Sequence, residues 1–509
     1  MAALVGCSTH DASDAPDLAL PSGESTSGNV LDVSALDMPA PRGMGTLVVQ
    51  IRDEAGYPIP ARLTFLGVDG TRTPVFTRAD IGIQQPGGIL AFDRAFVVGG
   101  AALLVPAGSY EVWFSHGPEW DAVSRRIHVG HASMVSESVT LRHVVDTPGW
   151  ISGDFHVHAE RSFDSKVPMA HRVYQFLADG VDLIVATDHN VIADYAPVIA
   201  RLGQSERLAS LQGDEVTTRD WGHFGAFPLV GGDSAVARGP IAVVDRTPVS
   251  MFAELRARWP QVLIDVHHPR LDKGKMGYFH LGGLDTKALR SKRRGFSFDF
   301  DAVEVLNGFQ DPDRLSVDAV LADWFAFLRR GYHVTATGNS DTHHLTFNLG
   351  GYPRNYVQLP EGHLDHLDAE ALILAVKAGR SYFTTGPIVD VTVGDQGLGD
   401  TVSTGGRPLQ LHVRVRAPGW IDVKRLTVLV DGIQVLERPV VGAVPVRFDE
   451  TLSVPIAHDA FVIVRVDGDT PMAPVIGDLA HFKVYPLAIT NPIWVDVDGD
   501  GEVSPSIVD

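Results

Sequence analysis

Two histidines one residue apart, His156 and His158, lie in the segment GDFHVHAERSFD at residues 153–164. The pattern before them predicts a short strand, and in a strand side chains two residues apart point to the same face. Both imidazoles are therefore expected to project together, and the carboxylate of Asp164 follows within reach of a tight turn. Imidazole and carboxylate groups gathered in this way favour binding of a metal cation.

Further residues of metal-binding type follow other short apolar runs of the chain. These residues are His189, Glu215, His268, Asp341 and His343, and His223 lies in the segment GHFGAFPL. A single histidine at a strand end is more often structural, but this many at successive strand ends are hard to produce by chance. In an α/β barrel the C-terminal strand ends converge on one mouth, so residues far apart in sequence are expected to meet there.

The elements that would position these residues lie between residues 150 and 387. Apolar runs occupy 182–189, 261–269, 300–308 and 333–343, and helical patterns occupy 168–180, 250–259, 316–331 and 368–380. Near-continuous apolar strands between helices indicate a mostly parallel sheet that is buried on both faces. We therefore predict an α/β barrel for this segment.

Alternating strand patterns flank the barrel, at 45–149 and at 388–490, and each predicts a β-sandwich. The first resembles carboxypeptidase regulatory-like or immunoglobulin-like domains. Residues 491–509 form an acidic tail with the sequence DVDGDG. Its residues Asp496, Asp498 and Asp500 fit the first positions of a calcium loop, although position 12 lacks the bidentate carboxylate, so an acidic turn is the alternative.

Composition excludes some classes of partner. The 509 residues suggest about three domains, and the formal charge of −20 disfavours nucleic acid. The segment LVGCS around the single cysteine, Cys7, resembles a bacterial lipobox, and a tether rich in Ser, Asp, Pro and Gly runs through residues 1–44. We expect an exported protein whose membrane contact is a lipid anchor, with a truncated N-terminus. A free cysteine in a disordered tail is the alternative.

The motifs of the middle segment resemble the PHP (polymerase and histidinol phosphatase) family, within its CehA/McbA branch of metal-dependent hydrolases. The matching stretches, in order, are GDFHVHAERSFD, VATDHN, GDEVT, GHFGAFPL, HHPR, EVLNG, GNSDTH and GRSYFTTGP. The resemblance implies a distorted (β/α)7 barrel that carries two or three divalent metal ions.

The resemblance also implies a ligand set. The first metal would be held by His156, His158 and Asp341; the second by Glu215, which bridges to the first, with His223 and His268; and the third by Asp164, His189 and His343. Many relatives carry Asn where this chain has His267, so His267 is expected to be an outer group or an extra donor.

Such a centre activates water for hydrolysis, which agrees with the lack of a GxSxG nucleophile motif in the sequence. Zn²⁺, Mn²⁺ or Fe²⁺ suits these ligands. We expect a phosphoesterase; the alternatives are hydrolysis of a carbamate or carboxylic ester, and a non-catalytic cell-surface binding protein. A small anionic ester is the expected substrate, because the connection between His268 and Phe298 is long and basic and could form a lid that attracts anions. A solvated surface insertion is the alternative.

Other polar residues are candidates for supporting roles. Asp188 is a candidate to orient a ligand. Asn307, Arg354 and Arg380 lie near predicted mouth segments, where an arginine could bind a substrate oxyanion. A structural salt bridge or a capping contact is the alternative for each of these three.

Overall fold

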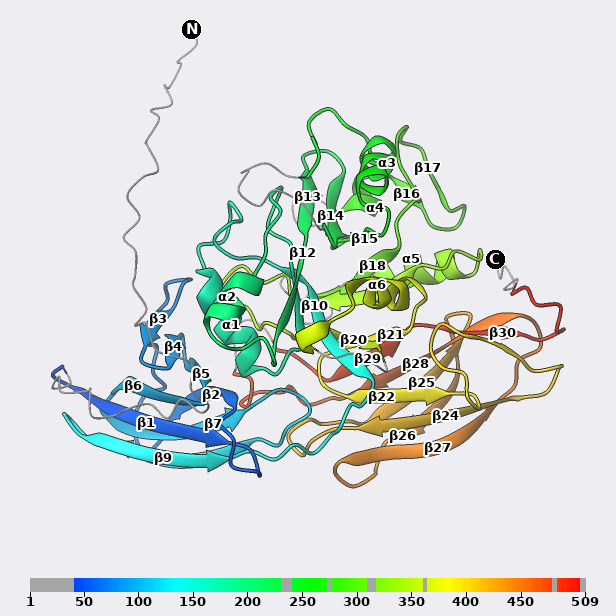
Figure 1. Ribbon diagram of the computed structural model, residues 1–509. Coiled ribbons are helices and arrows are strands. Elements are labelled where there is room, and N and C mark those ends of the chain that lie inside the picture. The colour runs from blue at the N-terminus through cyan, green and yellow to red at the C-terminus, as the bar shows by residue number, and fades with distance from the viewer. Residues whose placement is uncertain are drawn as a thin grey trace, which may run out of the picture.

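The computed structural model describes residues 41–229, 240–271, 277–308, 317–359, 364–477 and 483–503. The expectations about Cys7 and the tether up to residue 40 lie outside this part of the chain. The N-terminal and C-terminal strands lie at opposite ends of the molecule, with the middle segment between and above them (Figure 1). No helix of the described residues is long and apolar enough to cross a membrane.

The N-terminal segment forms two sheets around one apolar core. The first sheet has the order β6-β1-β9, with bounds Gly100–Pro106, Met44–Arg52 and Met134–Thr140. The second has the order β3-β4-β5-β2-β7-β8, with bounds Ile83–Gln85, Gly88–Ala91, Arg94–Val98, Pro60–Gly67, Gly108–Ser115 and Val123–Val129. Leu47 and Leu103 of the first sheet pack with Phe65 and Val112 of the second in this core, so the two sheets face each other.

The middle segment contains strands of two further sheets. One begins β12-β11-β10-β20-β21, with bounds Ala209–Gln212, Leu183–Ala186, Trp150–Val157, Arg354–Gln358 and Ser381–Thr384. The other has the order β13-β14-β15-β18-β19, with bounds Asp214–Thr218, Gly222–Phe227, Leu263–Val266, Ala302–Asn307 and Thr335–Asn339. These two sheets meet through isolated bridges between Val157 and Thr342 and between His189 and Glu215.

The expectation of a mostly parallel sheet is wrong, because both sheets are mixed. β13 and β14 pair antiparallel, as do β14 and β15, and β20 runs antiparallel to β10. Only residues 219–221 separate β13 from β14, which is far shorter than the dozen or so residues that a parallel crossover needs. The described strands do not pair into one continuous closed barrel.

Helices cover the middle segment at the predicted places. The predicted helices correspond to α1, α3, α5 and α6, with bounds Met169–Ala178, Pro248–Arg258, Val317–Leu328 and Ala369–Lys377. α3 begins before the predicted Ser250, because Thr247 caps it and accepts a hydrogen bond from the Ser250 N–H. The short helices α2 and α4 and the 3₁₀ turn η2, with bounds Ala196–Arg201, Tyr278–Leu281 and Leu364–His366, were not predicted.

The C-terminal segment shares a sheet with the middle segment. Strand β29 pairs with β21, so an eleven-stranded sheet continues across residue 387 into β28, β25 and β26 and also includes β23 and β30. The bounds of β29, β28, β25, β26, β23 and β30 are Leu487–Thr490, Ala460–Asp467, Arg425–Val430, Ile433–Pro439, Thr401–Ser403 and Ile493–Asp496. A separate sheet has the order β22-β24-β27, with bounds Ile388–Thr392, Leu409–Arg416 and Val446–Val454, and a small hairpin joins β16 and β17 at Leu284–Asp285 and Arg290–Ser291.

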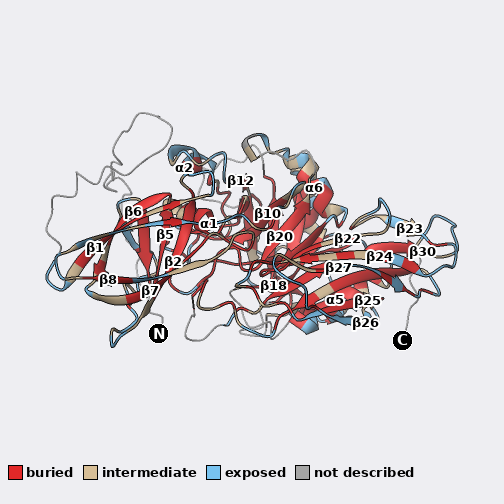
Figure 2. Ribbon diagram, turned by 90° about the horizontal axis from the view of Figure 1, so that it is seen from below, coloured by how far each residue is buried: buried red, intermediate tan, exposed pale blue. Residues whose placement is uncertain are grey.

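Buried contacts join the N-terminal segment to the other two. Arg62 of β2 forms a fully buried ion pair with Asp179 at the end of α1, and its Nη1 donates to the Ile476 carbonyl at 3.0 Å. Thr64 donates to the carbonyl of Val475 at 3.0 Å. Most strand residues of all three segments are buried (Figure 2). The middle segment is therefore held between its neighbours by specific polar contacts as well as by apolar packing.

Candidate metal centre

The two histidines of the HVH sequence project together, as their spacing predicts. His156 lies in β10 and His158 follows its last residue. Both side chains are fully buried, and their ring centroids are 5.0 Å apart. Backbone hydrogen bonds from Asp341 N to His156 O at 2.9 Å and from His158 N to Thr342 O at 3.1 Å hold the end of β10 against the segment after β19.

The structure brings all nine predicted ligands together in four overlapping groups, each with donor atoms within 4.8 Å of one another. The groups are His156, His158 and Asp341; His156, Glu215 and His268; His189, Glu215 and His223; and His158, Asp164, His189 and His343. The first and the last match the first and third predicted sites. The predicted second site is spread over the other two groups.

In the first group, Asp341 Oδ1 lies 3.2 Å from His156 Nε2 and 3.3 Å from His158 Nε2. Asp341 has a φ of 51° and His268 a φ of 29°, values that L side chains rarely adopt. Such backbone conformations concentrate at functional sites. The fold therefore accepts local strain in order to place these two side chains.

Glu215 of β13 lies at the centre of the cluster. Its Oε1 is 3.1 Å from His156 Nε2 and 3.4 Å from His268 Nε2, while its Oε2 is 2.7 Å from His189 Nδ1. The Nδ1 of His223 lies 3.3 Å from Oε1 as well. Each carboxylate oxygen thus faces a different set of imidazoles, which is the arrangement expected of a bridging ligand.

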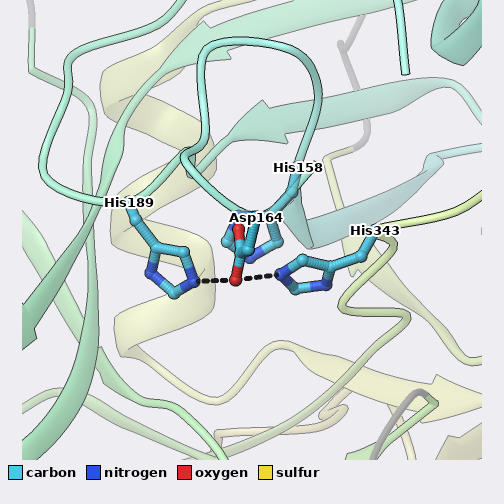
Figure 3. A group of neighbouring side chains, drawn as sticks. All are labelled: His158, Asp164, His189 and His343. Carbon is cyan, nitrogen blue, oxygen red and sulfur yellow. Dashed lines mark hydrogen bonds and ion pairs between the residues drawn. The ribbon is translucent and has the colours of Figure 1, made fainter. Parts of the chain in front are cut away.

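In the third group, Asp164 lies between His189 and His343 and contacts both (Figure 3). Asp164 Oδ2 is 3.0 Å from His189 Nε2 and 3.1 Å from His343 Nε2. The rings of His158 and His343 stack with centroids 4.1 Å apart. The Asp164 side chain is 35% exposed, whereas the side chains of Glu215 and Asp341 are buried, so the cluster opens to solvent beside Asp164.

The charges of the cluster shift one another's protonation. Burial alone would raise the pKa of Glu215, but His189, His156 and His223 outweigh it and hold this pKa well below its usual range. Burial alone would lower the pKa of His189, but Glu215 and Asp164 raise it to about 10. The carboxylates of the cluster thus favour a positive charge on neighbouring imidazoles such as His189, and a bound cation would supply that charge instead.

Buried nitrogen and oxygen atoms without a hydrogen-bond partner indicate whether these residues could bind metal ions. Six buried side-chain atoms of the predicted ligand residues have no hydrogen-bond partner among the described residues: His156 Nε2, His158 Nε2, Glu215 Oε2, His223 Nδ1, His268 Nδ1 and Asp341 Oδ1. Two ligand atoms that share a tetrahedral ion at about 2.1 Å lie about 3.4 Å apart. The ion pairs between histidines and carboxylates of the cluster span 2.7 to 3.5 Å, and all ligand atoms of each group lie within 4.8 Å of one another, so the residues could hold divalent metal ions.

One functional carboxylate was missed by the sequence reasoning. Glu304 of β18 is buried, and its Oε1 lies 2.9 Å from His156 Nδ1. Its Oε2 accepts from the backbone N–H of His268 at 2.7 Å and from Asn307 Nδ2 at 2.8 Å. Asn307 also donates to Asp341 Oδ2 at 3.0 Å. Glu304 therefore contacts His156 and His268 directly and Asp341 through Asn307. In the sequence, an acidic residue inside an otherwise apolar strand was the feature that could have indicated this role.

Two further candidates lie beside the ligands. His267 stacks on His156 with centroids 3.6 Å apart, and its Nδ1 is 2.9 Å from Glu215 Oε1, which agrees with an outer role. Burial lowers the pKa of His267 to about 4. Asp188 accepts a hydrogen bond from the backbone N–H of Ala159 at 2.7 Å. It therefore supports the loop after His158, and the expected contact with a ligand imidazole is not found among its hydrogen bonds.

The two candidate arginines do not reach the cluster. Arg354 is buried and donates to the carbonyls of Gly351, Gly180 and Asp179, each at 2.9 Å, so its guanidinium serves as a cap. Arg380 precedes Ser381, which aligns through Val357 with Ile151 in β10. His156 is five residues further along β10, about 17 Å away at the usual rise. Arg354 therefore has a structural role, and Arg380, whose Nη2 lies 3.3 Å from Asp400 Oδ1, pairs with an acid away from the cluster.

Two arginines of the basic connection after His268 contact other parts of the protein. Arg270 pairs with Asp323 at 2.5 Å, and Arg293 stacks on the ring of Trp221 at 3.7 Å. These contacts fix both guanidinium groups against the protein surface, so they give no support to a lid that attracts anions.

The tail brings two of its three predicted calcium ligands together. Asp496 and Asp498 form a group with Asp459, from the segment between β27 and β28, whereas Asp500 is not part of it. Both Asp496 oxygens accept backbone N–H groups, from Gly499 at 2.6 Å and from Gly501 at 3.1 Å. These hydrogen bonds describe an acidic turn after β30, and calcium binding here stays a prediction.

Comparison with known proteins gives only distant similarities. No family model and no curated protein matches the chain at a significant level. A two-domain protein from Bacteroides vulgatus, described as containing a predicted PHP-like metal-dependent phosphoesterase, matches at 16% identity over 67% of this chain and 96% of its own, with a TM-score of 0.35. An engineered protein matches at 12% identity over 65% and 81%, with a TM-score of 0.14. Similarities of this size carry no argument about activity.

Proposed function

We propose that this protein is a metal-dependent hydrolase of the PHP type that cleaves phosphoesters at a centre of two or three divalent ions. The observation that carries the proposal is the buried cluster around Glu215, where imidazole and carboxylate groups from separate strands converge with ligand atoms within 4.8 Å of one another and several buried nitrogens and oxygens have no hydrogen-bond partner among the described residues. The order of the motifs along the chain supports the same family. We interpret the two bridged sheets as the halves of a distorted barrel, with the cluster at their junction.

Each residue of the cluster would have a defined role in metal binding. His156, His158 and Asp341 would hold one ion, and Glu215 would link it to ions held by the remaining histidines and Asp164. Divalent ions bound in this way lower the pKa of bound water to about 7 and neutralise charge that develops on an ester oxygen. The side chains of Glu215 and Asp341 are shielded from bulk water, and substrate would approach from the side of Asp164, whose side chain is 35% exposed.

A variant of the bridging carboxylate tests this proposal. Glu215→Ala should remove the bridge and lower both metal content and turnover. Since outer partners of ligands already cost about 10- to 100-fold in affinity or activity, loss of this ligand should cost roughly a hundredfold or more. Metal per chain is measured by elemental analysis after loading with Mn²⁺ or Zn²⁺. Turnover is measured with aryl phosphates, phosphodiesters, aryl carbamates and aryl esters.

Glu450→Ala is the matched control, because Glu450 is exposed on β27 and should leave both readouts unchanged. Fewer than two transition metal ions per wild-type chain would favour the non-catalytic binding protein. Cleavage of carbamates or carboxylic esters without cleavage of phosphates would keep the metal centre and reject the phosphoesterase. Unchanged metal content in Glu215→Ala would contradict the bridging role.

A further inference from the structure

An apolar side chain stands exposed at the open side of the metal cluster. Phe163 lies between Ser162, which is buried, and Asp164, and 78% of its surface is accessible to solvent. Large apolar side chains in this kind of setting are normally covered, since exposing them to water is unfavourable. An exposed aromatic ring beside convergent polar groups is a feature of ligand sites.

The exposure of Phe163 is built into the loop that carries it. Ser162 Oγ donates to Asp164 Oδ1 at 2.9 Å and accepts from the His189 N–H at 3.2 Å. Ser165 Oγ donates to the carbonyl of His343 at 2.8 Å. Ser162 and Asp164, the neighbours of Phe163 in sequence, are thus held by cluster residues, so the loop is anchored on both sides of the ring.

The ring of Phe163 covers one residue of the cluster. It stacks on the imidazole of His189 with centroids 4.7 Å apart and an interplanar angle of 22°. His189 in turn contacts Asp164 and Glu215. One face of the phenyl ring therefore rests on the third ligand group, and its high exposure leaves the opposite face open to solvent.

We propose that Phe163 determines specificity by stacking on an aromatic group of the substrate, so that the preferred substrates are aryl esters. This inference rests on the proposed hydrolase function. A substrate held at the open side beside Asp164 would have its reacting group over the cluster and its aryl group against the free face of Phe163. Offset stacking of two aromatic rings adds to affinity beyond the area that is buried.

The experiment compares Phe163→Leu with the wild type on phenyl phosphate and methyl phosphate. Leucine keeps an apolar side chain and removes the ring. We expect kcat/KM for phenyl phosphate to fall about tenfold, with kcat/KM for methyl phosphate unchanged, because only the aryl substrate loses its stacking partner. Phe163→Tyr should restore the preference. Metal content, measured by elemental analysis, should be equal in all variants.

Binding of two non-hydrolysable probes separates this inference from the proposed function. Phenylphosphonate should bind the metal-loaded wild type more tightly than methylphosphonate, and Phe163→Leu should remove the difference, as measured by calorimetry. Tyr57→Leu is the control, since Tyr57 is 67% exposed in the turn between β1 and β2. If the wild type binds phenylphosphonate selectively but cleaves no phosphoester, the proposed reaction fails and the aryl site stands.

Other outcomes overturn the inference. If Phe163→Leu lowers kcat/KM equally for phenyl phosphate and for methyl phosphate, the ring only shields His189. Unchanged kinetics and unchanged phosphonate binding would mean that Phe163 contacts neither substrate, which leaves docking of a macromolecule as the use of the exposed ring.

Discussion

Replacement of Glu304 by glutamine tests how the cluster is positioned. The carboxylate of Glu304 accepts four hydrogen bonds, two at each oxygen. The donors are His156 Nδ1 and Asn339 Nδ2 at Oε1, and the His268 N–H and Asn307 Nδ2 at Oε2. Glutamine has the same shape but one NH₂ group in place of an oxygen. In either orientation of the glutamine amide, its NH₂ group would face two of these four donors. The two hydrogen bonds that those donors make to Glu304 would therefore be lost.

The expected cost follows from these contacts. Loss of an outer carboxylate partner of a ligand histidine weakens metal binding about 10- to 100-fold. This corresponds to about 1.4 to 2.7 kcal/mol of binding free energy. Because Glu304 also fixes the backbone of His268 and reaches Asp341 through Asn307, we expect Glu304→Gln to lie toward the upper end of this range.

Metal affinity is measured by competition with a chromophoric chelator, and the visible spectrum of the Co²⁺-loaded protein reports ligand geometry. Asp265→Asn is the matched control, since Asp265 is a buried acid on the neighbouring strand β15 that accepts a hydrogen bond from Thr337 Oγ1 at 2.7 Å. The smaller change Asn307→Ala keeps the Glu304 carboxylate, removes the hydrogen bonds from Asn307 to Glu304 and to Asp341, and serves if Glu304→Gln unfolds. An affinity within twofold of wild type in both variants would refute the positioning role.

Two predictions concern stability. Burial and the nearby Glu304 raise the pKa of Asp265 from 3.8 to about 8 in the metal-free protein, so the folded state holds this proton more tightly than the unfolded chain and stability should fall between about pH 4 and pH 8. The free energy of unfolding is measured by urea denaturation at pH 5 and at pH 8. Asp265→Asn should reduce the loss of stability between these two pH values, and an equal loss in variant and wild type would contradict the prediction. Arg62→Met leaves Asp179 buried without its partner and should cost about 3–5 kcal/mol in the free energy of unfolding. Arg62→Met combined with Asp179→Leu should recover part of this loss, and a cost below about 1 kcal/mol for the single change would show that the pair is dispensable.

The ligand cluster was accessible from sequence because its residues follow apolar runs in a recognisable order. All nine predicted ligands lie together, since a strand end fixes where the next side chains point. Glu304 was missed because strand periodicity gives no reason to expect a charge inside a buried strand. The roles of Arg354 and Arg380 depend on strand register, which the one-dimensional pattern does not contain.

The pattern of apolar residues also could not predict whether neighbouring strands are parallel or antiparallel. A buried strand has the same composition whether its neighbour is parallel or antiparallel, so the runs alone favoured the wrong sheet type. The three residues between β13 and β14 were the available signal, because such a short link permits only a hairpin. Asp459 could not be assigned to the tail turn, because it lies 37 residues before Asp496 in sequence.

The pairing of β29 with β21 means that the ligand-bearing segment cannot be cut out of the chain as an independent piece. A fragment that stops at residue 387 would leave the backbone groups of β21 open along one edge, ready to associate with other chains. The C-terminal strand β29 therefore completes the sheet that contains β21. During synthesis, the ligand-bearing segment should reach its final fold only after the C-terminal strands have left the ribosome.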